Sequence, residues 1–226
     1  MNNFSLNPVL PSKEQIQQLP IFQNLPLQQI QVIHSLQQCH AIEQELKTCA
    51  LFGFDSESKP TFNKGEVSTG PHLIQLASRD KAYLFQISPA ILEFLKPIFE
   101  NKNQMKVGFG LKNDAHLFRK KGIELHNVIE LSKCFSAFGF SNPMGLKNAM
   151  ALLFQVNFPK SKKISTSNWA RKILTPHQIE YAAADAYAPV LVFEELLRLG
   201  LLPKTITRHL FKLSMQPNTI KAETDA

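Results

Sequence analysis

The chain has 226 residues, of which 44% are hydrophobic and 19% charged, a balance typical of a globular domain and not of a disordered chain. This length fits one large domain with a substantial core, and no apolar run reaches the roughly 18–20 residues that a membrane-spanning helix needs. The formal net charge of +7 suits a polyanionic partner such as nucleic acid, although charge alone does not identify one.

Three cysteines, Cys39, Cys49 and Cys134, are odd in number, lie far apart and lack the spacing of zinc ligands. They predict free thiols in a reducing compartment. The N-terminus has no basic region that leads into an apolar segment, so it does not resemble a secretory signal. We therefore expect a cytoplasmic protein with no membrane association.

The first 26 residues are rich in proline, asparagine and glutamine and have no sustained hydrophobic periodicity. We interpret residues 1–26 as an N-terminal extension, with a short helix after Ser12 in which Gln15 completes a capping box. Residues 27–204 are predicted to form one domain. Residues 205–226 are predicted to form a C-terminal tail, whose polar part from Met215 is expected to be loose.

Within the domain, short apolar runs bounded by turn residues predict strands, and capping signals mark the starts of helices. The predicted strands span residues 30–34, 51–57, 72–77, 82–87, 105–109 and 127–131. The predicted helices span residues 35–47, 88–100, 112–121, 145–155 and 176–200, and residues 159–163 are predicted to be a loop. Strands that come first, with helices inserted and then following, predict an α/β domain with one central mixed sheet flanked by helices.

The predicted strand over residues 51–57 ends in two carboxylates, Asp55 and Glu57. They share one face, because residues two apart on a strand point the same way. Two negative charges roughly 6–7 Å apart repel each other, and burying one without a partner costs several kcal/mol. A divalent cation with hard oxygen ligands is the simplest positive group to place between them. Alone, such a pair also occurs at ordinary solvated strand ends.

Two further carboxylates lie on predicted helices. Asp114 lies in the first turn of its helix, where it either favours the helix dipole or reaches the acidic strand end through the glycine-flanked loop before it. Asp185 follows Tyr181 by four residues, so both side chains share one helix face, and the alanines between them let that helix lie close to a sheet or a site. A buried Asp185 needs a partner, and no basic residue stands four residues before or after it.

These residues belong to three ordered segments that resemble the motifs of the DEDD 3′–5′ exonucleases of the tyrosine subclass. Ribonuclease D and the Werner-type exonuclease domain have the most similar patterns. The segments are residues 54–62 with Asp55 and Glu57, residues 106–123 with Asp114, and residues 167–186 with Tyr181 and Asp185. The resemblance covers about residues 30–200.

The sequence departs from the family pattern at two positions. Ile173 stands where relatives usually have proline, and Glu130 stands where many have aspartate after the last strand. The position of Glu130 is not among the metal ligands of the family, so the departure does not put activity in doubt.

The resemblance implies an RNase H-like fold and hydrolysis with two Mg²⁺ or Mn²⁺ ions. The implied reaction releases nucleoside 5′-monophosphates from the 3′ end of a single strand of RNA or DNA. The implied metal ligands are Asp55, Glu57, Asp114 and Asp185, and Tyr181 would orient the attacking water. By the same analogy Asp55 is shared by both ions, which fits four negative charges neutralised by two divalent cations.

Basic residues surround Trp169, just before the last predicted helix. We expect Trp169 to lie in the core. Lys162, Lys163 and Lys172 either contact the phosphates of a nucleic acid, which requires some cationic surface, or belong to a solvated loop. We keep these three lysines as candidate nucleic-acid contacts.

Two other functions are compatible with the residues. The chain could be a catalytically inactive exonuclease-fold protein that only binds nucleic acid or protein, although all five implied site residues are present. It could also be a metal-dependent phosphatase of small molecules, in which case the positive net charge would be incidental.

Overall fold

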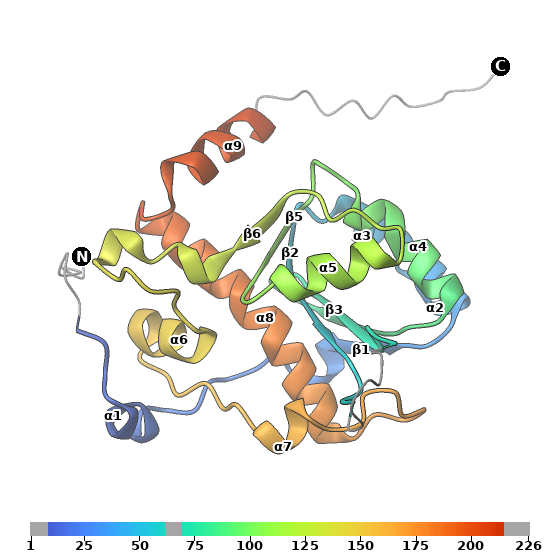
Figure 1. Cartoon of the computed structure of the whole chain (residues 1–226), viewed down its shortest axis with the longest axis horizontal. Coiled ribbons are helices and arrows are strands. Elements are labelled where there is room, and N and C mark those ends of the chain that lie inside the picture. Colours follow the sequence, from blue (N-terminus) through green and yellow to red (C-terminus); the bar gives the residue numbers. More distant parts are fainter. Residues whose placement is uncertain (1–8, 62–68, 215–226) are drawn as a thin grey trace.

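The computed structural model describes residues 9–61 and 69–214 of the chain. Its centre is a six-stranded sheet in the order β1-β4-β3-β2-β5-β6 (Figure 1). The strands are β1 (Ile30–Ile33), β2 (Leu51–Glu57), β3 (Leu73–Ala77), β4 (Ala82–Gln86), β5 (Met105–Gly108) and β6 (Val128–Glu130). The predicted mixed sheet is therefore confirmed, and all predicted strands are present close to their expected bounds.

Strand β2 lies inside the sheet and changes its neighbours along its length. Residues 51–53 pair in parallel with β5, and residues 53–57 pair with β3 in the antiparallel sense. Beyond Gly53, the side of β2 that faces β5 has no ladder partner among the described residues. The end of β2 that carries the two carboxylates is therefore open to the segment that follows β5.

Helices cover both faces of the sheet (Figure 1). One face packs with α2 to α5 in a cluster that includes Phe52 and Phe54, and the other packs against α8. The helices are α1 (Lys13–Gln18), α2 (Leu36–Ala41), α3 (Glu43–Thr48), α4 (Pro89–Phe99), α5 (Lys112–Lys120), α6 (Leu146–Phe154), α7 (Lys162–Ser165), α8 (Pro176–Arg198) and α9 (Lys204–Ser214). Within the described residues, none of them has the length and apolar character needed to cross a membrane.

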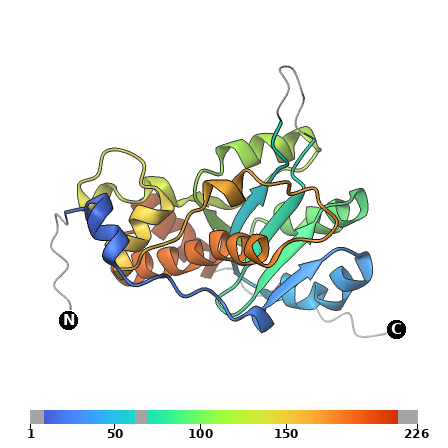
Figure 2. The ribbon, with the colours of Figure 1, turned by 90° about the horizontal axis from the view of Figure 1, so that it is seen from below.

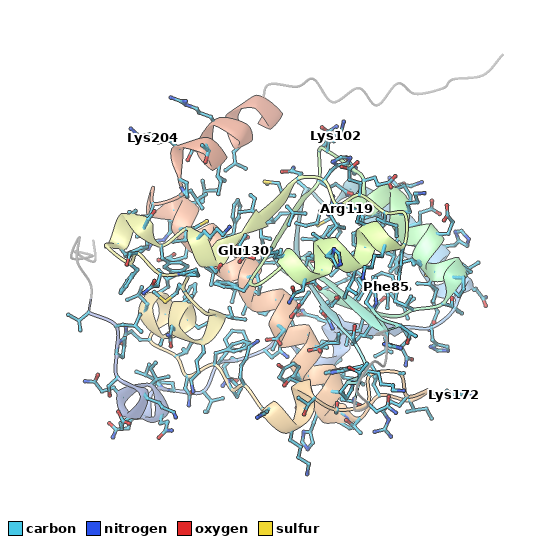
Figure 3. The ribbon with its side chains drawn as sticks, in the orientation of Figure 1. Phe85, Lys102, Arg119, Glu130, Lys172 and Lys204 are labelled. Carbon is cyan, nitrogen blue, oxygen red and sulfur yellow. The ribbon has the colours of Figure 1, made fainter. Side chains whose placement is uncertain are left out.

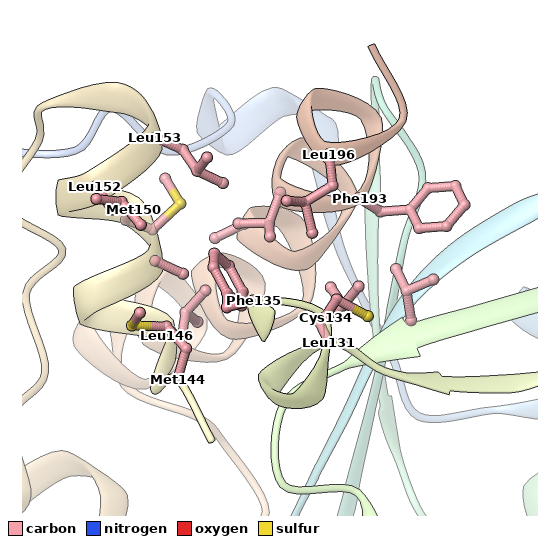
Figure 4. Packing of buried hydrophobic residues seen from close by; sticks show 14 of the residues in the cluster. Leu131, Cys134, Phe135, Met144, Leu146, Met150, Leu152, Leu153, Phe193 and Leu196 are labelled. Carbon is pink, nitrogen blue, oxygen red and sulfur yellow. The ribbon is translucent and has the colours of Figure 1, made fainter. Parts of the chain in front are cut away.

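A second apolar cluster lies between α6 and the C-terminal half of α8 (Figure 4). Phe135, Leu146 and Met150 belong to this cluster together with Phe193 and Leu196 of α8, and all five are buried. Helix α8 thus packs against the sheet with its first half and against α6 with its second half, so its position is fixed along its whole length.

The structure differs from the sequence predictions at three helices. The single helix expected over residues 35–47 is wrong, because the chain breaks at Ile42, whose N–H bonds to the carbonyls of Cys39 and His40. The loop expected over residues 159–163 is wrong at its end, where the Ser161 hydroxyl accepts the N–H of Ile164 and starts α7 at Lys162. Helix α9 was not predicted and occupies part of the predicted tail.

The expected loose tail from Met215 and the end of the first motif at Phe62 lie outside the described residues. The domain boundaries at residues 27 and 204 stay predictions.

The described part of the N-terminal extension runs along α8 (Figure 2). The predicted capping box at Ser12 and Gln15 is present at the start of α1. Further on, the Asn24 side chain donates a hydrogen bond of 2.9 Å to the Glu180 carbonyl, and the Phe22 ring lies 6.2 Å from that of Tyr187. These contacts anchor the segment to the helix that carries Tyr181 and Asp185.

Strand β2 and helix α8 lie very close together at Gly53. A Cβ atom at this position would lie 1.8 Å from the backbone carbonyl oxygen of Ala186 and 2.9 Å from the side chain of Val190. No side chain larger than hydrogen fits there, so glycine on β2 and alanines on α8 allow the helix backbone to lie against the strand.

Lys106 on β5 is fully buried, which is rare for a lysine. Its ammonium group donates to the carbonyls of Phe99, Asn101 and His126 at 3.2, 2.9 and 3.3 Å. Burial lowers the pKa of Lys106 to about 8. Its hydrogen bonds connect the end of α4 and the segment before β6 to strand β5.

We expect Gly53→Ala to lower the free energy of unfolding by at least about 1–3 kcal/mol, because the new methyl group must displace the α8 backbone. Denaturant unfolding measures this change. The control is Gly145→Ala, where a Cβ atom has no heavy atom within 4 Å and the expected loss is below about 1 kcal/mol. Equal effects of the two substitutions would contradict the close approach.

Candidate active site

The side chains of β2 alternate between the two faces of the sheet. Phe52 and Phe54 are fully buried on the face covered by α2 to α5, as expected for core residues. Gly53 faces α8, so Asp55 and Glu57 continue on the α8 side, where both are partly buried. The strand therefore brings two carboxylates under the helix that carries the third motif.

Helix α8 supplies Tyr181 and Asp185 to the same place. Thr175 and Gln178 form a reciprocal capping box at its start, with Pro176 in the first turn, as the sequence predicts. Asp185 is buried, with its side chain only 3% exposed. The predicted core position of Trp169 is confirmed, and its ring centroid lies 6.1 Å from that of Tyr181.

Asp114 reaches the acidic strand end from the first turn of α5 and is buried. The Ser56 hydroxyl, between the two carboxylates of β2, donates a short hydrogen bond to Asp114 Oδ1. Of the two interpretations of Asp114, the structure favours the one that places it at the site.

Glu130 holds the loop that leads to Asp114. Its two carboxylate oxygens accept the backbone N–H groups of Gly110 and Leu111 at 3.0 and 2.8 Å, and one of them also accepts the N–H of Ser132 at 3.1 Å. Figure 3 shows Glu130 beside the start of α5. The sequence identified Glu130 only as a departure from the family pattern, whereas the structure shows that it connects β6 to the helix of Asp114.

The four carboxylates perturb one another. Burial and then the negative charges of Asp185, Asp114 and Glu57 raise the pKa of Asp55 well above its usual range. Burial and the charge of Asp185 raise the pKa of Glu57 to about 8, and burial raises the pKa values of Asp114 and Asp185. The site thus holds more negative charge than the protein itself compensates.

Tyr181 belongs to the same electrostatic group. Burial and the charges of Asp185 and Glu57 raise the pKa of its phenol far above the usual value. The hydroxyl therefore stays protonated near neutral pH and is available as a hydrogen-bond donor, not as a base.

Lys160 is the basic partner of Asp185 that the sequence did not reveal. Its ammonium nitrogen lies 3.2 Å from Asp185 Oδ1 and 3.3 Å from Oδ2. It also lies 5.9 Å from the ring centroid of Tyr181. From the sequence we considered only partners four residues away on the same helix. Lys160 lies on the loop before α7, 25 residues earlier in the chain, and so was not identified.

Gln75 is a second residue that the sequence did not single out. It lies directly opposite Asp55 on β3 and is fully buried, yet neither atom of its amide has a hydrogen-bond partner among the described residues. Opposite residues on antiparallel strands point to the same face, so this amide lies on the side of the acidic cluster. Its signal in the sequence is a polar residue inside the apolar run of β3.

The donor set fits hard divalent cations. Four carboxylates with raised pKa values offer the oxygen ligands that such cations prefer. Within the described residues, however, no three acidic, histidine or cysteine side chains are close enough together to hold a metal ion by themselves. Instead, Asp185 forms an ion pair with Lys160, and Asp114 accepts a hydrogen bond from Ser56. Two of the candidate metal ligands are therefore bound to other side chains of the protein.

Two of the three candidate lysines line different hollows. Lys163 lines a hollow of about 570 Å³ together with Arg171 and His177, whereas Lys172 lines a separate hollow of about 480 Å³ together with Val32 and His34. Figure 3 shows Lys172 on the loop between α7 and α8, and Lys162 is the first residue of α7.

Residues 30–200 match the profile of a protein family described as 3′–5′ exonuclease. The chain is 31% identical over 169 residues to the bifunctional 3′–5′ exonuclease/ATP-dependent helicase WRN of Mus musculus, covering 70% of this chain and 12% of that protein. It is 27% identical over 219 residues to the exonuclease mut-7 homolog of Aedes aegypti, covering 84% of this chain and 28% of that protein. The chain thus corresponds to only part of these relatives.

Solved structures show the same fold. The Nibbler EXO domain of Aedes aegypti has a TM-score of 0.68 at 23% identity, and the match covers 84% of this chain and 99% of that domain. Escherichia coli RNase D has a TM-score of 0.61 at 21% identity, with 82% and 50% of the two chains covered.

The sheet order, its flanking helices and these neighbours show an RNase H-like fold, as the sequence predicts. More specifically, the chain belongs to the 3′–5′ exonuclease family.

The raised pKa values predict how stability depends on pH without metal. In EDTA, we expect the free energy of unfolding to fall as pH rises from about 4.5 to about 8, the ordinary and the raised pKa of Glu57. In this window Glu57 is ionised in the unfolded chain but still protonated in the folded protein. The folded state is therefore favoured at low pH, and this contribution to the free energy of unfolding is lost as pH rises through the raised pKa of Glu57. Denaturant unfolding at a series of pH values measures it.

Glu57→Gln should reduce the slope, because the amide does not titrate. Glu93→Gln, at an exposed position of α4, is the control and should leave the slope unchanged. A free energy of unfolding that rises with pH across this window would contradict the prediction.

Proposed function

We propose that the chain is an active 3′–5′ exonuclease, which hydrolyses the terminal phosphodiester of a nucleic acid and releases nucleoside 5′-monophosphates. The observation that carries this proposal is the convergence of Asp55, Glu57, Asp114, Asp185 and Tyr181 from β2, α5 and α8 at one place. A cluster of buried acids costs stability unless a positive charge compensates it, which supports a cationic cofactor.

Mg²⁺ or Mn²⁺ would be held by the carboxylates of Asp55, Glu57, Asp114 and Asp185. When bound, such ions supply Lewis-acid chemistry that acidifies the attacking water and neutralises charge on the leaving oxygen.

The residues of the chain position the reaction. The protonated Tyr181 hydroxyl would donate a hydrogen bond to the attacking water and hold this water in line with the phosphorus atom. Alternatively, it would donate to a phosphate oxygen and so orient the substrate. Glu130 would fix the loop that places Asp114, through its bonds to Gly110 and Leu111. Burial of Asp185 keeps competing water from its carboxylate.

The substrate we propose is a single strand of RNA or DNA with a free 3′ end. A solved neighbour, Trypanosoma brucei RNase D, is described in complex with RNA U12, which supports nucleic acid as the ligand class. The net charge of +7 supports it as well. Lys162, Lys163 and Lys172 are proposed phosphate contacts, and because Lys163 and Lys172 line separate hollows they would contact different parts of a strand. The free cysteines support a reducing compartment such as the cytoplasm.

A time course on 5′-labelled RNA and DNA single strands with Mg²⁺, Mn²⁺ or EDTA tests the proposal. We expect a ladder that shortens from the 3′ end with metal and no cleavage in EDTA. Asp55→Asn should abolish the ladder, whereas Asp80→Asn, on an exposed turn, should not.

Intact strands that nevertheless bind the protein would instead support the alternative of a catalytically inactive binding protein. The ion pair between Lys160 and Asp185 favours this alternative. Release of phosphate only from small phosphate esters would support the phosphatase alternative.

We expect Tyr181→Phe to lower the hydrolysis rate by about 10²–10³, within the range for one well-placed polar group, because the ring and its packing remain while the donor is lost. Substrate binding should hardly change. Single-turnover rates and equilibrium binding measure the two effects. Tyr187→Phe, six residues along the same helix, is the matched control. An unchanged rate in Tyr181→Phe would refute the proposed positioning of the attacking water. A loss of binding affinity as large as the loss of rate would instead assign Tyr181 to substrate binding.

A further inference from the structure

Lys160 is placed where it meets a proposed metal ligand directly. Its ammonium group lies within 3.3 Å of both carboxylate oxygens of Asp185. Its charge also lowers the pKa values of Asp55, Glu57 and Asp185, although burial and mutual repulsion outweigh this effect. A single loop residue therefore supplies positive charge to three of the four carboxylates.

The ion pair and a metal ion cannot both occupy Asp185 in this arrangement. Mg²⁺ coordinates carboxylate oxygens at about 2.0–2.1 Å and demands near-ideal geometry, so an ammonium group on the same two oxygens obstructs its approach. The two cations also repel each other, and this repulsion is strong where solvent is excluded. Because Asp185 is only 3% exposed, it cannot turn outward to serve both.

Lys160 is the partner that can leave. Its side chain is 44% exposed, and it lies on the loop between α6 and α7, next to Pro159 and Ser161. The flexible four-carbon stem of a lysine allows the ammonium group to move into water at little cost. The fold thus holds the carboxylate fixed and leaves the amine movable.

We propose that Lys160 is an internal competitor of the divalent cation. It neutralises Asp185 while the site holds no metal, and it must give up this ion pair before the metal can bind there. Lys160 is a positioning residue in this role and not a metal ligand. The inference rests on the proposed function, because it takes Asp185 to be a metal ligand.

Two consequences follow from this competition. Removal of the Lys160 charge strengthens metal binding, because the cation no longer has to displace the amine. The same removal destabilises the metal-free protein, because Asp185 then stays buried without a counter-ion.

The test measures Mn²⁺ binding to the full chain without nucleic acid, by calorimetry or by the electron paramagnetic resonance signal of free Mn²⁺. We expect Lys160→Met to lower the Kd for Mn²⁺ by about 2- to 5-fold, the range for a partly exposed ion pair. Lys160→Arg keeps the charge and should retain the weaker binding. Lys163→Met removes the same charge three residues further on and should leave the Kd unchanged.

A second measurement uses thermal unfolding in EDTA and in Mn²⁺. Lys160→Met should lower Tm in EDTA and show a larger rise of Tm on addition of Mn²⁺ than the unsubstituted protein. In the Asp185→Asn background, Lys160→Met should no longer lower Tm in EDTA, since the ion pair is already absent. This cycle separates the ion pair from a general effect of the substitution on folding.

An unchanged or weaker Mn²⁺ affinity in Lys160→Met would overturn the competition and leave the proposed metal site intact. If neither the unsubstituted protein nor Lys160→Met binds Mn²⁺, both the competition and the metal-dependent function are wrong. If Lys163→Met tightens binding as much as Lys160→Met, the effect is long-range electrostatics and the specific role of Lys160 is refuted.

Discussion

The close approach of β2 and α8 at Gly53 and Ala186 is the constraint on which the site depends. The two backbones are in direct contact, so no side chain lies between them that could change its rotamer to accommodate a shift. The rotation of the helix relative to the strand is therefore fixed. Asp55 lies two residues beyond Gly53, and Asp185 lies one residue before Ala186, so one contact sets the distance between the two acids. The apolar cluster of α6 with the second half of α8 then prevents the helix from tilting about that point.

The remaining parts of the site are arranged around an excess of negative charge. Ser56 and Glu130 orient Asp114 and its loop through hydrogen bonds, whereas Lys160 offsets the charge of Asp185. Glu130 is itself acidic, yet it is satisfied by backbone N–H groups and so does not need a cation. Two kinds of carboxylate thus coexist within a short distance: one that organises the backbone and others that depend on a positive partner.

The sequence predicted most of the sheet and the acidic residues of the site because both depend on local patterns. Alternation along β2 separates Phe54 from Asp55, and the capping box at Thr175 locates α8. Lys160 and Gln75 were not predicted, because their importance comes from contacts between segments far apart in the chain. Likewise, the break between α2 and α3 at Ile42 was not predicted, because no glycine or proline stands there.

Lys106 has a consequence for how motions of this fold can be observed. An amine that is fully enclosed by protein and bound to three carbonyls cannot meet an amine-reactive reagent until the region around β5 opens. Surface lysines would be labelled at once, so the slow acylation of this one side chain would report the frequency of opening. Measured by mass spectrometry, the rate at which this lysine is acylated would report how often the sheet beside the candidate site opens.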